Sequence, residues 1–417
     1  MKFTDYVVTE TTGNSVDPLG YLKPSGVVSS KVFRQFTVLS NHPAYQGFLA
    51  FVFSYLAGRS ITPSKRDFAK RVRDLEILWG LLNVRAGDSV VNVTKFEPIA
   101  NFDSLRLSQV RTRSALYARL NYGVLGHYAS PSALWKILEQ GATGLTSQGV
   151  ELATAWRYRQ GSDFAHLADQ WLNDCDLFAI DDLETWQTRY RLSAEPEKPE
   201  KKIWQSLIED FCTKDPVIAP LWQKPVPQEI LALSTAEDTY PLFFPALQTH
   251  YAGSHELCRR IERCNRFERL SGLVQFVFEW EYVRRLDEIR LKGLTQGNLP
   301  AVVTSEIAIA ATNLLPEPDE KEFWYLPATL SAISDHETMA EAILAHHTRH
   351  QRSKGASPFI SGDTIAVQER VRAMEFVNFF DKMVSDTAKL VDAVQWRYHR
   401  NWHFGRAHEW QRYAGVA

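Results

Sequence analysis

Apolar residues recur at helical spacing along most of the chain. From Tyr45 to Leu56, large apolar side chains stand at positions 48, 49, 52, 53 and 56, which predicts a buried helix. The same spacing predicts helices over 104–122, 255–292 and 328–350. Strand signals are few and concentrate at 85–100. We therefore predict a mainly α, multi-helical fold.

A further helix is predicted to begin at Thr62 and Pro63, because Thr caps a first helical turn and Pro fits its first position. Its apolar stripe would consist of Leu75, Leu78, Trp79 and Leu82. Arg66, Lys70 and Arg73 recur at intervals of four and three residues. They should share one face of the helix, away from that stripe.

Charge is unevenly distributed. The formal net charge is −2, yet residues 59–119 hold twelve Lys and Arg against six Asp and Glu. A basic helical tract is typical of proteins that contact a polyanion. The candidate nucleic-acid-binding residues are Arg66, Lys70, Arg73, Arg106, Arg111, Arg113 and Lys136. The alternative is an ordinary solvated Lys and Arg face.

The segment Leu145-Thr146-x-x-Gly149-x-x-Leu152-Ala153 resembles the strand-to-helix passage that ends many winged-helix DNA-binding domains. The resemblance implies a helix that is capped by the Thr, enters through a close turn at the Gly and buries the Leu and Ala together with Trp156. It also implies a small winged-helix-like module in the N-terminal half, with the recognition helix at 131–140.

This segment departs from the winged-helix pattern in two ways. Residues 141–146 are too few for a full wing hairpin and hold no Lys or Arg, and the one basic residue at 131–140 is Lys136. The module could therefore read bases or contact proteins.

A second resemblance covers about the first 160 residues. The turn Asp17-Pro18-Leu19-Gly20, the aromatic-rich helix at 45–56 and the Leu-Thr-x-x-Gly element together resemble poorly characterised helical proteins found beside bacterial anti-phage defence genes. That likeness implies a subunit of a multi-protein complex.

Residues 193–202 have the composition of a linker, with two prolines, alternating charge and no large apolar residue. This divides the chain into an N-terminal helical segment at 1–60, a basic winged-helix-like helical domain at 61–192 and a C-terminal helical domain at 203–417.

Composition indicates a folded protein of a reducing compartment. Hydrophobic residues make up 45% of the chain and charged residues 23%. The four cysteines lack a C-x-x-C spacing, which fits the cytosol better than a disulfide framework. No basic segment followed by an apolar run opens the sequence, and the longest apolar stretch is far shorter than the ~20 residues of a membrane span. We predict a cytoplasmic protein without membrane contact.

Two histidine clusters are candidates for metal chemistry. One runs from His336 to His350, with His346 and His350 four residues apart on one helical face, and the other from His399 to His408. Neither has a third ligand at a familiar metal spacing, and core packing or a polar helix surface is the alternative. The nucleophile and phosphate-binding motifs that mark common enzyme classes are absent from the sequence, and we predict no cofactor.

These observations favour a non-enzymatic accessory subunit of a bacterial anti-phage defence complex, which contacts DNA or a nucleic-acid-processing partner through a basic helical surface. The alternative is a metal-dependent hydrolase or nuclease that uses one of the histidine clusters. A third possibility is a scaffold whose basic faces bind an acidic partner protein.

Overall fold

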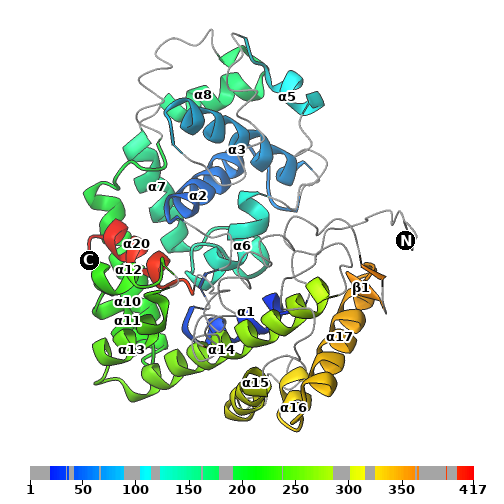
Figure 1. Ribbon diagram of the computed structural model, residues 1–417. Coiled ribbons are helices and arrows are strands. Elements are labelled where there is room, and N and C mark those ends of the chain that lie inside the picture. The colour runs from blue at the N-terminus through cyan, green and yellow to red at the C-terminus, as the bar shows by residue number, and fades with distance from the viewer. Residues whose placement is uncertain are drawn as a thin grey trace. The chain divides into compact units, whose positions relative to one another are not determined.

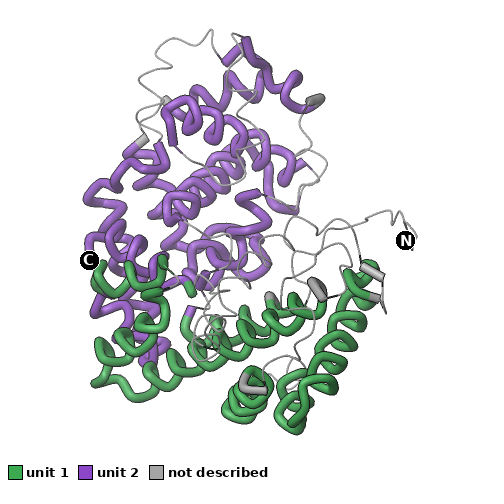
Figure 2. The backbone as a smooth tube through the Cα atoms, viewed as in Figure 1, with its two compact units in different colours: residues 1–32, 227–402 green, residues 33–226, 403–417 purple. Residues whose placement is uncertain are grey.

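The described part of the chain is mainly helical, as predicted (Figure 1). The computed structural model describes residues 19–33, 35–36, 42–64, 67–88, 104–113, 123–160, 163–177, 191–236, 238–284, 301–314, 325–361, 364–365, 391 and 402–417. The chain divides into two compact units (Figure 2). Unit 1 comprises 1–32 and 227–402, and unit 2 comprises 33–226 and 403–417.

Unit 2 is built around one thoroughly apolar helix, α2. The helices of this unit are α2 (Ala44–Ala57), α3 (Phe68–Arg85), α5 (Leu107–Arg113), α6 (Val124–Leu134), the 3-10 turn η3 (Gln140–Ala142), α7 (Ser147–Gln160), α8 (Asp163–Leu172), α10 (Lys198–Lys214), α11 (Ala219–Gln223) and α20 (Phe404–Ala414). Helix α2 buries residues on all its sides because α3, α6 and α7 pack around it. The buried helix predicted at 45–56 is thus confirmed.

Aromatic rings fill the interior of unit 2. Phe48 of α2 stacks on Trp79 of α3, with ring centroids 4.6 Å apart, and Trp156 of α7 lies 4.7 Å from Phe51. Trp135 stacks on Trp410 of α20, and the rings of Trp204 and Trp222 pack edge-on against this pair. All four tryptophans are buried. Ring burial of this extent contributes a large share of the stability of the unit.

Two helix starts differ from the sequence prediction. Helix α3 begins at Phe68, not at Thr62, whose hydroxyl instead hydrogen-bonds with Ser64 at 3.0 Å. Helix α6 begins after Gly123 and contains Pro131 in its last turn. The Thr-Pro pair at 62–63 therefore precedes α3 without capping it, and the predicted start at 131 lies inside α6.

Unit 1 is organised along a single long helix. Its elements are α1 (Leu22–Phe33, whose last residue belongs to unit 2), α12 (Gln228–Ala232), α13 (Tyr240–His250), α14 (His255–Arg284), α15 (Ala301–Asn313), α16 (Tyr325–Leu330), α17 (His336–Ser353) and the short strands β1 (Ile360–Ser361) and β2 (Thr364–Ile365). Helices α13, α15 and α17 pack against α14, which has 30 residues. The predicted long helix at 255–292 is confirmed as far as Arg284; the remainder lies outside the described residues.

The division into units differs from the predicted domains. Residues 1–32 belong with the C-terminal part of the chain, and the predicted linker at 193–202 lies inside unit 2. Helix α10 begins at Lys198, and Glu200 in its first turn is completely buried. The charged composition of this segment reflects an exposed helix start with one buried carboxylate rather than a linker.

None of the helices in the described part combines the length and apolar character that a membrane span requires. Most of the predicted extended stretch at 85–100 falls outside the described residues, and so does the helix predicted beyond Arg113.

Candidate functional site

The described part of the basic tract is used largely to hold unit 2 together. Arg73 of α3 is only 3% exposed, and its Nη1 donates to Glu76 Oε2 at 2.8 Å. The second carboxylate oxygen, Glu76 Oε1, accepts from the backbone N–H of Val124 at 2.9 Å, which satisfies one of the open amides at the start of α6. Burial raises the pKa of Glu76 to about 7, against the lowering influence of Arg73 and Val124. The expectation that Arg73 faces solvent is therefore wrong.

Arg111 pairs with a second carboxylate of α3. Asp74 is completely buried, and Arg111 Nε donates to its Oδ1 at 3.2 Å. Arg71 Nη1 lies 3.8 Å from Asp74 Oδ2, and the Trp171 indole donates to the backbone carbonyl of Asp74 at 2.9 Å. Burial raises the pKa of Asp74, while Arg111 and Arg71 lower it. These contacts tie α5 and α8 to α3.

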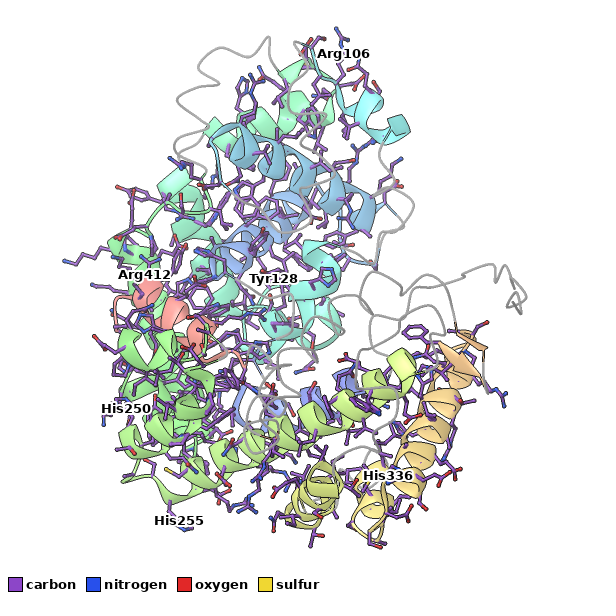
Figure 3. All side chains as sticks on the ribbon, viewed as in Figure 1. Arg106, Tyr128, His250, His255, His336 and Arg412 are labelled. Carbon is purple, nitrogen blue, oxygen red and sulfur yellow. The ribbon has the colours of Figure 1, made fainter. Side chains whose placement is uncertain are left out.

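Two of the seven predicted cations are exposed without an ion pair inside the described ranges. Lys70 stands on the surface of α3, and Arg106 precedes α5 at the edge of unit 2 (Figure 3). Arg66 and the side chain of Arg113 lie outside the described residues. Of the five predicted cations that the structure describes, Arg73, Arg111 and Lys136 pair with carboxylates and the other two are exposed.

Lys136 forms an ion pair on the surface, in which the two side chains are 47% and 36% exposed. Its Nζ lies 3.1 Å from Asp210 Oδ2 of α10. The predicted recognition helix at 131–140 is not one helix, because α6 ends at Leu134 and the chain turns through a bridge between Leu138 and Leu145. This short loop, closed around η3, presents no helix for a DNA groove.

The start of α7 has the cap and the close turn that the Leu-Thr-x-x-Gly segment predicts. The Thr146 hydroxyl accepts from the backbone N–H of Gly149 at 3.1 Å. A Cβ on Gly149 would lie 2.0 Å from the backbone oxygen of Ile137, so only glycine fits there. Leu152 and Trp156 on the inner side of α7 are completely buried.

The outer side of α7 is fully accessible. Its exposed residues are Ser147, Val150, Glu151, Thr154, Arg157 and Tyr158; we call this set the α7 outer face. Tyr158 is 72% exposed and Val150 is 50% exposed, both high for apolar or aromatic side chains. Glu151 and Arg157 form no ion pair within the described part of the chain.

Three residues that sequence reasoning missed, Arg159, Glu200 and Tyr413, form a polar network in the interior of unit 2, and the His42 ring packs beside it. The Arg159 guanidinium pairs with Glu200 at 3.2 Å, where the two side chains are 5% and 0% exposed. The hydroxyl of Tyr413 donates to Glu200 Oε1 at 2.7 Å, and the ring of His42 lies 5.3 Å from the Tyr413 ring. Burial, followed by Arg159, lowers the pKa of His42 to about 4, so this imidazole is neutral at pH 7.

The network joins three helices, α7, α10 and α20, and His42 adds the segment before α2. No local motif connects these residues. Burial raises the pKa of Glu200 while Arg159 and Tyr413 lower it. We interpret the network as a structural clamp, because Arg159 Nη1 also donates to the backbone carbonyl of Ala194 at 3.1 Å and so joins α7 to the segment before α10.

The predicted His336–His350 cluster serves packing within unit 1. The rings of His346 and His350 are parallel with centroids 6.3 Å apart. His346 Nε2 lies 2.9 Å from the carbonyl oxygen of Leu19, and His350 packs so close to Gly20 that a Cβ there would lie 2.6 Å from its ring. These contacts hold the segment before α1 against α17.

The neighbouring His347 is buried and its Nε2 accepts from the backbone N–H of Phe359 at 2.8 Å. In the C-terminal cluster, His399 lies outside the described residues, whereas His403 is buried beside Phe33 and Phe36. Within the ranges that the structure describes, no group of three His, Cys, Asp or Glu side chains could hold a metal ion.

Comparisons with protein-family models, with characterised proteins and with solved structures find no match to this chain.

Proposed function

We propose that the chain is a non-enzymatic accessory subunit of a protein complex, and that unit 2 binds a partner protein rather than DNA. The supporting observation is the commitment of its cations: Arg73, Arg111 and Lys136 each pair with a carboxylate of the same unit. A DNA phosphate would have to replace Glu76 or Asp74 as the partner. That exchange would leave a buried carboxylate without its counter-charge, which costs several kcal/mol.

Three of the five predicted cations that the structure describes are exposed. They are Lys70, Arg106 and Lys136, and Lys136 makes a surface ion pair with Asp210. Three contacts would neutralise about three phosphates, whereas DNA-binding proteins with strong salt dependence make about 6–10 such contacts.

A protein partner fits the accessible surface better. Tyr158 and Arg157 are exposed side by side on α7, and tyrosine and arginine are enriched in protein interfaces. The resemblance of the first 160 residues to helical proteins of bacterial anti-phage defence loci suggests the setting of such a complex.

The test is a titration of fluorescently labelled duplex DNA with the purified chain, followed by anisotropy near physiological salt. We expect a Kd no tighter than about 10⁻⁴ M, the weak end of non-specific binding. Arg106→Ala together with Lys70→Ala should weaken even that interaction. A Kd of about 10⁻⁶ M or tighter would overturn the preference for a protein partner.

A further inference from the structure

The α7 outer face has a pattern that is symmetric about its centre. Helix α7 has 14 residues, and Thr154 lies in the middle of its exposed side. Val150 precedes Thr154 by four residues and Tyr158 follows it by four. Glu151 precedes it by three and Arg157 follows it by three. Residues at these spacings share one helical face.

We propose that the α7 outer face binds a second copy of this chain, with the two α7 helices antiparallel and crossing at Thr154. A two-fold axis at that point brings Val150 level with Tyr158 of the second copy. It also brings Glu151 level with Arg157 of the second copy. Every contact then occurs twice, as an isologous interface requires.

Charge complementarity identifies a second copy as the occupant. An antiparallel arrangement sets one Glu and one Arg against each other at both ends of the contact, while a parallel arrangement in register would set Glu against Glu and Arg against Arg. Both charges are exposed and form no ion pair with any residue that the structure describes.

Burial of Val150 and Tyr158 would stabilise the dimer. Val150 and Tyr158 are 50% and 72% exposed, and both would be covered in the dimer. Thr154 is small enough for close approach at the crossing point, and its hydroxyl already donates to the carbonyl of Val150 at 2.8 Å. A contact limited to one helix of this length is smaller than the roughly 800 Å² per partner of a stable interface, so we expect a reversible dimer with a Kd in the micromolar range.

The test is sedimentation velocity of the full chain over a range of concentrations, with three charge variants. Glu151→Arg alone and Arg157→Glu alone each place like charges at both ends of the contact, and each should shift the protein to monomer. The double variant Glu151→Arg with Arg157→Glu restores opposite charges and should restore the dimer.

Two further variants separate this face from general surface hydrophobicity. Val150→Glu should abolish the dimer, whereas Leu242→Glu, at an equally exposed site of unit 1, should leave it intact. Circular dichroism should be unchanged in all variants because the altered side chains are exposed, and so should the melting temperature when it is measured at concentrations below the Kd of the dimer. A chain that stays monomeric at high micromolar concentration would overturn the proposal, and so would a double variant that remains monomeric or single variants that remain dimeric.

Discussion

Replacement of Arg159 by Met should strongly destabilise unit 2 at neutral and alkaline pH. The change keeps the apolar volume of the side chain but removes the counter-charge of Glu200, whose side chain is completely buried. Removal of one partner from a buried ion pair costs about 3–5 kcal/mol, because the remaining charge stays without compensation. The hydrogen bond from Tyr413 persists and keeps the cost within that range.

The loss of stability caused by Arg159→Met should increase as pH rises. Burial raises the pKa of Glu200, and loss of Arg159 removes the strongest influence that lowers it. A carboxyl group with a raised folded-state pKa binds its proton more readily in the folded state. The stability of Arg159→Met should therefore fall as pH rises through and above the unfolded-state pKa of a Glu, and the defect should be smaller at pH 5 than at pH 8.

Urea unfolding followed by tryptophan fluorescence measures this effect, since several buried tryptophans lie in unit 2. Arg59→Met is the matched control, because its pair with Asp169 is 37% and 43% exposed and such surface pairs contribute about 1 kcal/mol or less. The reasoning is refuted if Arg159→Met costs no more than the control at pH 8, or if its cost is the same at both pH values.

Three other changes test the contacts around α3 and α7. Gly149→Ala should cost about 1–3 kcal/mol, because a Cβ there meets a backbone carbonyl at 2.0 Å, whereas Gly405→Ala, in open space, should be neutral or slightly stabilising in the same denaturation assay. Arg73→Ala should lower the melting temperature by several degrees, while Lys70→Ala should leave it within a degree or two, and equal effects would contradict the burial difference. The pKa of Glu76 is raised from 4.5 to about 7, so wild-type stability should fall relative to Glu76→Gln as pH rises across that interval; parallel stability curves would exclude this titration.

Local sequence determined the helices that bury a continuous apolar stripe. The inner residues of α2, α3 and α14 stood at helical spacing, and the Thr146 cap with the obligatory Gly149 was visible within ten residues. Such features depend on neighbours along the chain. The predicted start at Thr62 was wrong because the apolar contact at Phe68, not the cap signal, fixes where α3 begins.

The prediction that Arg73 faces solvent was wrong for a different reason. Helical periodicity placed it away from the main stripe, but the N-terminus of α6 covers that side and Glu76 bridges the two helices. The network of Arg159, Glu200 and Tyr413 could not be predicted at all. Its members come from distant parts of the chain and meet only when α7, α10 and α20 pack.

The salt dependence of residual DNA binding tests the central claim most directly, because its slope counts the phosphates that the chain neutralises. If the five cations Arg66, Lys70, Arg73, Arg111 and Arg113 contacted phosphates, log K would fall with log salt at a slope of about −4 to −5. The structure pairs Arg73 and Arg111 with carboxylates. Without these two, three of the five contacts remain, so we predict a slope of about −3 at most. A slope of about −4 or steeper would show that the paired arginines reach DNA and would contradict the account.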